Sequence, residues 1–291
     1  MDVFERTLYN GFLSGVSFEG DTFFYPNPLE FDGTFKFNRG VCGRSPWFDC
    51  SCCPVNVVRV LPSLPGYIYA TQGKEIFVNL FIGNTAEFKV NGQPLKIQQK
   101  TNYPWDGKVT FGFDNAEAVH AKLNIRVPGW VSGEVMPGDL YSYINDKRLN
   151  IELTVNGKQK EVSISNGYLR LEKDSWKKGD IVEVNFEMAV RKVKAHKKVL
   201  ANTGKMAFER GPLVYCAEET DNYGGVLELK VSEEDEFNFE FDNGLFKGTG
   251  IIKGPAEEQT NQKSISLIPY YAWAHRNLGE MAVWLNYHSL R

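Results

Sequence analysis

The sequence has no uninterrupted apolar run close to the ~18 residues that a membrane-spanning helix needs. It also lacks the basic start and apolar stretch of a signal peptide, since residues 1–6 carry two acidic side chains. That second absence has no weight if the sequence begins inside a longer protein. We therefore expect no membrane partner, and the compartment stays unknown.

An excess of positive charge is absent as well. The chain has 33 Lys and Arg against 36 Asp and Glu, which gives a formal net charge of −3. Its one basic run, residues 191–198, alternates charged with apolar side chains. This pattern indicates a strand with one solvated face rather than a nucleic-acid-binding stripe, so we expect no nucleic-acid partner.

Cysteine is scarce, with five residues in 291. Cys42, Cys50, Cys52 and Cys53 fall within twelve positions, whereas Cys216 stands alone. The adjacent Cys52 and Cys53 do not easily form a disulfide with each other, because the bond needs particular Cβ geometry. Such a cluster is more typical of a metal or catalytic site than of a disulfide scaffold.

Aromatic residues are plentiful, at 13% of the chain, which favours pleated, half-buried surfaces. From about Tyr67 onward, short alternating runs are separated by turn signals such as Asn91-Gly92 and Asn156-Gly157. We predict a mainly β chain with two β-sandwiches, at residues 67–190 and 191–291. A helical segment at residues 1–66 precedes them.

Two short helices are expected in that first segment. Phe4, Leu8 and Phe12 share one helical face near the start. After a long aromatic loop, a second helix is predicted to begin at Pro54, where proline suits the first turn. We expect it to break before Pro62 or Pro65.

The loop that enters this second helix holds three thiols within four positions, at Cys50, Cys52 and Cys53. A helix N-terminus lowers the pKa of a nearby thiol, and thiolate is both a nucleophile and a zinc ligand. Equally, free cysteines are often small buried apolar side chains. The scattered histidines, His120, His196, His275 and His288, are better explained as structural.

Four segments of the sequence resemble one family. They are ERTLYNGFLSG at 5–15 with FYPNPLE at 24–30, WFDCSCCPVN at 47–56, Gly179-Asp180 and Met188 with ERGPLVY at 209–215, and IPYYAW at 268–273 with MAVW at 281–284. In this order they resemble the β-L-arabinofuranosidase family of glycoside hydrolases, family 127, and the Cys-x-Cys-Cys-Pro segment is the most specific.

The resemblance implies a retaining glycosidase with an (α/α)6 barrel followed by two β-sandwiches. Cys52 matches the family's nucleophile, which is also held on zinc, and Cys53 matches a further zinc ligand. The remaining zinc ligands and the acid/base Glu are expected upstream of this sequence, with residues 1–66 as the end of the barrel. The implied substrate is a plant-type glycan with L-arabinofuranose.

These 291 residues alone are therefore expected to be inactive, with a barrel domain or a second copy of the chain as partner. Two other interpretations stay open: a non-catalytic carbohydrate-binding or structural β-sandwich module, and a thiol or zinc protein built on the cysteine cluster. Glu30 could face a sugar pocket but fits a solvated loop carboxylate better. Trp105 and Trp130 could stack on sugars, although plugging a core is the commoner role.

Overall fold

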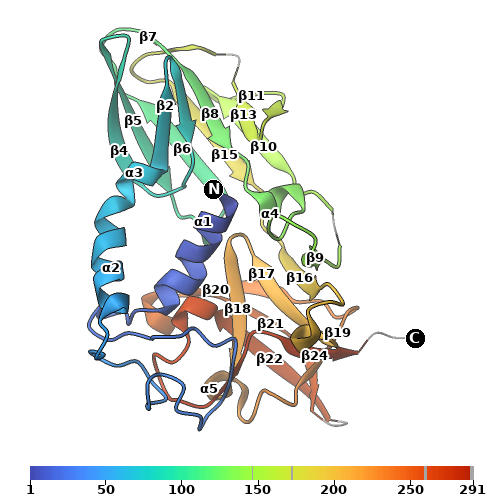
Figure 1. The fold of residues 1–291 in the computed structure, drawn as a ribbon. Coiled ribbons are helices and arrows are strands. Elements are labelled where there is room, and N and C mark those ends of the chain that lie inside the picture. Colours follow the sequence, from blue (N-terminus) through green and yellow to red (C-terminus); the bar gives the residue numbers. More distant parts are fainter. Residues whose placement is uncertain (146, 172, 259–260, 289–291) are drawn as a thin grey trace. The chain divides into compact units, whose positions relative to one another are not determined.

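The computed structural model describes residues 1–145, 147–171, 173–258 and 261–288 (Figure 1). Strands dominate this part of the chain, so the expected mainly β fold is confirmed. None of its helices is both long and apolar enough to cross a membrane. The chain forms two compact units, built from residues 61–133 and 147–188 with Met1 (unit 1) and from residues 2–60, 134–146 and 189–291 (unit 2).

Unit 1 contains three sheets within the described residues. The largest has strand order β11-β10-β15-β6-β5-β4, with bounds Lys158–Gln159, Ile151–Val155, Ile181–Phe186, Lys108–Phe113, Gln93–Thr101 and Asn84–Val90. A second has order β12-β13-β8-β3-β2, with bounds Ile164–Ser165, Tyr168–Arg170, Lys122–Arg126, Glu75–Val78 and Tyr69–Gln72. The third pairs β14 (Ser175–Trp176) with β7 (Val119–His120), and two short helices are α3 (Pro65–Ile68) and α4 (Gly129–Ser132).

The turn signals of unit 1 are confirmed. Asn91 and Gly92 join β4 to β5 with φ values of 49° and 82°, and Asn156 and Gly157 join β10 to β11 with 52° and 72°. Positive φ at both central residues gives the turn whose twist matches that of the two strands it connects. Along β5, buried and exposed residues alternate, which places Leu95 and Ile97 in the core.

Unit 2 joins its strands in one sheet of eleven members over the described residues. The order is β1-β23-β18-β22-β21-β19-β24-β17-β16-β9, with β20 beside β21. Their bounds are Glu30–Asp32, Glu280–Ala282, Leu213–Glu218, Asn261–Pro269, Thr249–Glu258, Lys230–Ser232, Leu285–His288, Lys205–Arg210, Val190–Ala195, Tyr141–Tyr143 and Asn238–Asp242. Short helical turns are α5 (Glu219–Asn222), η2 (Leu200–Asn202), η3 (Leu245–Lys247) and η4 (Tyr270–Ala272).

Two details of unit 2 bear on the predictions. The basic run forms β16, in which Val193 is buried, as the alternating pattern predicts. Strand β1 pairs with β23, so Glu30 belongs to a strand and not to a loop. The division into two β-sandwiches, with the boundaries given above, stays a prediction.

The N-terminal helix is α1 (Asp2–Arg6), which continues as the π-helix η1 (Thr7–Phe12) and buries Leu8. The second helix, α2, runs over Cys52–Ser63, so it begins two residues before the predicted start at Pro54. It passes Pro62 and ends before Pro65, the second of the two predicted breaks. Pro54 is tolerated in the first turn, where its missing N–H has no partner within the helix. Pro62 lies one residue before the helix ends.

Candidate functional site

Cys52 and Cys53 are the first two residues of α2. Their Sγ atoms lie 3.9 Å apart, and the Cys53 thiol is 4.0 Å from the backbone oxygen of Tyr25. Cys52 and Cys50 are exposed and Cys53 is half-buried. All five cysteines are free, as expected. Cys42 lies apart and donates from Sγ to the Thr34 carbonyl at 3.3 Å.

The surroundings of the two thiols set their pKa values in opposite directions. Desolvation acts to raise the pKa of Cys52, but hydrogen bonds with Cys53, Tyr25 and Cys50 outweigh it and lower that pKa. Desolvation and the neighbouring Cys52 raise the pKa of Cys53. The guanidinium of Arg39 lies 4.0 Å over the Tyr25 ring and supplies a positive charge here. Of the pair, Cys52 is thus the more easily ionised thiol.

The spacing of the two sulfur atoms suits two positions of a zinc site. Tetrahedral geometry with Zn–S bonds of ~2.3 Å places two sulfurs about 3.8 Å apart. Over the residues with assigned positions, however, no group of three or more His, Cys, Asp or Glu could hold a metal ion. The chain therefore fits as the donor of two ligands and not as a complete zinc centre.

Asn38 organises the loop in front of the thiols. Its side chain is fully buried, accepts from the Tyr25 N–H at 2.7 Å, and donates to the carbonyls of Phe23 at 3.1 Å and Gly43 at 2.8 Å. A buried amide with three such bonds fixes the local backbone, because breaking any one leaves a polar group unpaired. Tyr25 is therefore held in register beside Cys53.

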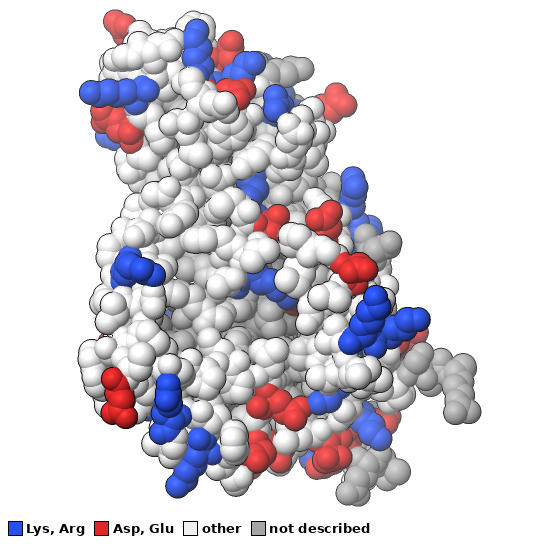
Figure 2. All heavy atoms as spheres, viewed as in Figure 1, with Lys and Arg blue, Asp and Glu red and all other residues white. Residues whose placement is uncertain are grey.

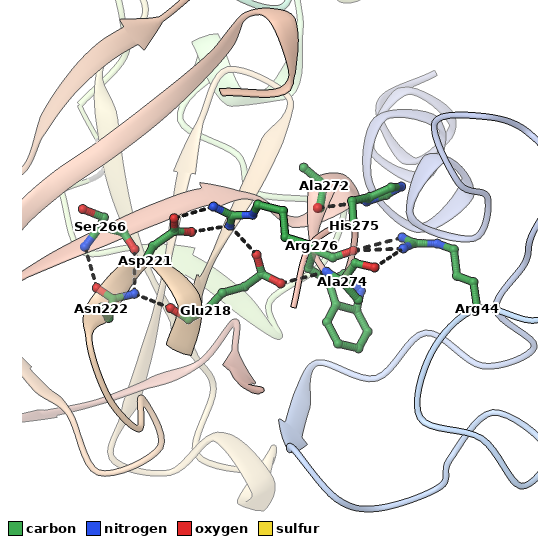
Figure 3. Close-up of polar contacts among 10 residues, drawn as sticks. Arg44, Glu218, Asp221, Asn222, Ser266, Ala272, Ala274, His275 and Arg276 are labelled. Carbon is green, nitrogen blue, oxygen red and sulfur yellow. Dashed lines mark hydrogen bonds and ion pairs between the residues drawn. The ribbon is translucent and has the colours of Figure 1, made fainter. Parts of the chain in front are cut away.

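Arg44 anchors the same loop to the C-terminal part of unit 2 (Figure 3). Its guanidinium donates to the carbonyls of Trp273 and Ala274 at 3.1 Å and of Ser14 at 2.9 Å. Burial lowers the pKa of Arg44 to about 10. The next residue, Ser45, pairs with Phe23, so this anchor fixes the start of the segment that leads to Cys50.

The turn that Arg44 contacts is itself held by a partly buried ion-pair network (Figure 3). Glu218 accepts from the Ala274 N–H and from Arg276, both at 2.7 Å, and Arg276 also pairs with Asp221 at 2.5 Å. Burial raises the pKa of Glu218. Ala274 has a φ of 57°, a strained value for a non-glycine residue, and this network holds it there.

The other singled-out side chains have structural environments. Glu30 is exposed and pairs with Lys205 at 2.6 Å, in line with a solvated carboxylate. Trp130 is buried and donates to the Tyr103 hydroxyl at 3.3 Å, whereas Trp105 is half-buried. His275 stacks on Phe18, which agrees with a structural role.

Sequence reasoning missed Asn38, Arg39 and Arg44. No motif marks them, because their contacts form only on folding. Asn38 and Arg39 contact residues of the same loop, and Arg44 bonds to carbonyls 229 and 230 residues away. The glycine of Arg39-Gly40 is a weak sequence signal for a turn, and in the structure both residues have positive φ. The network of Glu218 and Arg276 was missed for the same reason. Their spacing of 58 residues carries no periodicity.

Across the face drawn in Figure 2, basic and acidic side chains are interspersed. This agrees with the near-neutral composition of the chain. The comparison with known families covers nearly the whole chain. Residues 1–66 match the family 127 β-L-arabinofuranosidase catalytic domain, residues 75–188 its middle domain, and residues 190–286 its C-terminal domain.

Individual relatives agree with this. The non-reducing end β-L-arabinofuranosidase of Bifidobacterium longum is 32% identical, over 97% of this chain and 44% of its own length. A solved family 127 β-arabinofuranosidase is 43% identical with a TM-score of 0.92, covering 99% of this chain and 45% of that protein. The family 127 β-L-arabinofuranosidase of Geobacillus stearothermophilus T6 is 36% identical with a TM-score of 0.86, over 99% and 46%. The chain thus spans about half the length of these relatives.

Proposed function

Because this chain belongs to glycoside hydrolase family 127, we propose that it supplies the thiol part of a retaining active site for β-L-arabinofuranosides of plant-type glycans. The observation that carries the proposal is the position of Cys52 and Cys53. They open helix α2 as adjacent thiols, inside the segment matched by the family's catalytic domain. The relatives from Bifidobacterium longum and Geobacillus stearothermophilus are β-L-arabinofuranosidases, which motivates the choice of sugar.

Cys52 is proposed as the nucleophile. Its thiolate attacks the anomeric carbon, a C–S bond forms, and the bond to the leaving oxygen breaks while that oxygen takes a proton from a carboxylic acid. Water then attacks the anomeric carbon and gives a proton to the same carboxylate while the C–S bond breaks, so two inversions give net retention. The exposed side chain of Cys52 is open to a substrate, and the partial positive charge at the start of α2 favours the thiolate.

Cys53 and Cys52 are proposed as two of the zinc ligands. Zinc, if bound there, would keep both sulfurs deprotonated and would help to hold the nucleophile in place. Cys53, half-buried against the Tyr25 carbonyl, would fix the orientation of the pair. Within one copy, the described residues offer no group of three or more metal-binding side chains, so the remaining ligands are proposed to come from a barrel domain or from a second copy of the chain.

The acid/base group is likewise proposed to lie outside these 291 residues. General acid–base help contributes ~10²–10⁴-fold, and the loss of substrate positioning removes more. We therefore expect residues 1–291 alone to show no measurable hydrolysis of an aryl β-L-arabinofuranoside and to retain well under one zinc per chain.

The decisive test joins the N-terminal half of the solved 43%-identical relative to residues 1–291. We expect this chimera to hydrolyse the aryl arabinoside and to hold about one zinc per chain. Cys52→Ala should lower kcat by at least ~10³-fold, as removal of a nucleophile does. Cys53→Ala should lower both zinc content and activity.

Cys42→Ala is the matched control, because this free thiol lies outside the pair and should leave rate and zinc content unchanged. Retention of full activity by Cys52→Ala in an active chimera would refute the nucleophile. Normal zinc content in the Cys52→Ala/Cys53→Ala double variant would refute the ligand assignment.

A further inference from the structure

Unit 1 has an open cleft where β10 turns into β11 and the chain crosses to β12 and β13. Its volume is about 670 Å³. The lining residues are Leu153, Val155, Asn156, Lys158, Gln159, Lys160, Glu161, Ser163, Arg170, Leu171 and Lys173. This size lies in the range of ~300–1,000 Å³ that is typical of ligand pockets. The cleft belongs to unit 1, whereas the thiol pair belongs to unit 2.

Basic side chains predominate in this cleft, although the chain as a whole is slightly acidic. Four of the described lining side chains are basic and one, Glu161, is acidic. The side chains of Lys158, Lys160 and Arg170 are exposed, and no hydrogen bond or ion pair is found for them among the described residues. These three cations are therefore available to a ligand, and the walls of a cleft concentrate their field.

The floor and the polar groups of the cleft restrict the kind of ligand. Leu153 and Val155 are buried and Leu171 is half-buried, so the floor is apolar. The amide of Gln159 and the hydroxyl of Ser163 also line the cleft and can bond to neutral hydroxyl groups. Sugar rings offer both apolar C–H faces and hydroxyl groups, and uronic acids add a carboxylate for the cations.

Other anions fit less well. A single inorganic ion would leave most of a cleft of about 670 Å³ empty. Single-stranded nucleic acids are usually bound by stacking their bases on aromatic rings, and the described lining includes no aromatic residue. Arg170 presents a planar fork that matches a carboxylate with two parallel hydrogen bonds.

We propose that this cleft binds acidic saccharides, with Lys158, Lys160 and Arg170 pairing with uronate carboxylates along a short stretch of sugar chain. The cleft would then hold an acidic part of a polysaccharide independently of any reaction at the thiols.

The test is calorimetric titration of the 291-residue protein with trigalacturonate at about 20 mM and about 200 mM salt. We expect binding that weakens several-fold at the higher salt concentration. The double variant Lys158→Gln/Arg170→Gln should bind at least tenfold more weakly. Both side chains are exposed and have no hydrogen-bond or ion-pair partner among the described residues, so the fold should tolerate the change.

The matched control is Lys89→Gln/Lys100→Gln, which removes the same charge from exposed positions of β4 and β5 in the same unit. It should bind trigalacturonate like the unchanged protein. The proposal is overturned if trigalacturonate does not bind, if the cleft variant and the control weaken equally, or if neutral arabinotriose binds as tightly. Equal affinity for an oligothymidylate, lost in the same cleft variant, would also overturn it in favour of nucleic acid.

Discussion

The two helical segments of the first 66 residues differ in what they bury. Helix α1 with η1 buries Glu5, Leu8 and Asn10, although it is short. Helix α2 is twelve residues long and buries only Pro54. Isolated helices of this length are marginal in water and depend on packing of an apolar face. The first helix has its packing partner within unit 2, whereas nothing described covers most of the second.

The apolar side chains of the first segment extend this contrast. Of the eighteen large hydrophobic residues that are exposed in the described chain, ten lie within residues 1–66. Phe35 and Val58 are each 68% exposed and Trp47 is 62% exposed. Exposed apolar surface of this kind marks interaction sites. The segment matches a catalytic domain whose relatives are about twice as long as this chain, which supports the proposal that a further domain covers it.

Two asparagines allow the contrast to be tested most sharply. Asn10 in η1 and Asn56 in α2 each donate to the carbonyl four residues earlier, at 2.8 Å. Asn10 also donates to the Pro212 carbonyl and accepts from the Val214 N–H, each at 2.8 Å. Asn10→Ala should lower the free energy of unfolding by about 3 kcal/mol, because a buried carbonyl and N–H lose their partner.

Urea unfolding followed by tryptophan fluorescence measures this difference. Asn56→Ala is the control and should change the free energy of unfolding by less than ~0.5 kcal/mol, since its side chain is exposed. Equal losses for the two variants would show that the N-terminal helix is no better anchored than α2, and the comparison would fail.

Acidic pH should also loosen the anchored segment. His275 stacks on Phe18 at 3.8 Å, and burial together with the nearby Arg44 lowers its pKa to about 4. An unfolded histidine has a pKa of ~6.5, so above that pH both states are neutral and His275 adds nothing. Between pH ~6.5 and ~4 the unfolded state binds a proton that the folded state rejects, so stability falls as the pH falls.

After allowance for solvent screening of this partly exposed ring, the loss should amount to about 1–2 kcal/mol. His275→Phe keeps a ring against Phe18 and removes the titration. The variant should therefore show a smaller drop in unfolding free energy between pH 7 and pH 4, measured in urea. His120→Asn, at an exposed position, should keep the original slope. An unchanged slope in His275→Phe would rule out His275 as the source.

The sequence allowed the β-rich part to be predicted, because strand alternation and Asn-Gly turns are local signals. The turns at Asn91 and Asn156 and the strand over residues 190–195 are confirmed for this reason. The predicted start of α2 was wrong because Pro54 was taken as the first helical residue, whereas the predicted end before Pro65 agrees with the structure. The effect of proline depends on its position in the helix. Pro54 lies in the first turn and Pro62 lies one residue before the end, so neither interrupts the middle of α2.

Only part of the candidate site could be predicted from the sequence. Cys52 and Cys53 could be singled out because the cysteine cluster and the family motif are both local features of the sequence. Their catalytic and zinc-binding roles stay predictions. The residues that hold the loop were not predictable. Asn38, Arg44 and Glu218 bond to backbone groups of segments up to 230 residues away, as for Arg44 with Ala274, and such contacts leave no pattern in a single sequence.

The smallest expected effect comes from the surface of α2. Val58→Ser should change the free energy of unfolding by less than ~0.5 kcal/mol, because the side chain is already 68% exposed. In the sheet, Val193 is 1% exposed, and Val193→Ala should cost about 2 kcal/mol as a cavity forms. Sedimentation velocity of the Val58→Ser protein should also show less self-association, because the variant shrinks an uncovered apolar surface. If Val58→Ser instead lowered the free energy of unfolding by more than ~1 kcal/mol, α2 would already pack against this chain, and no covering domain would be needed to explain it.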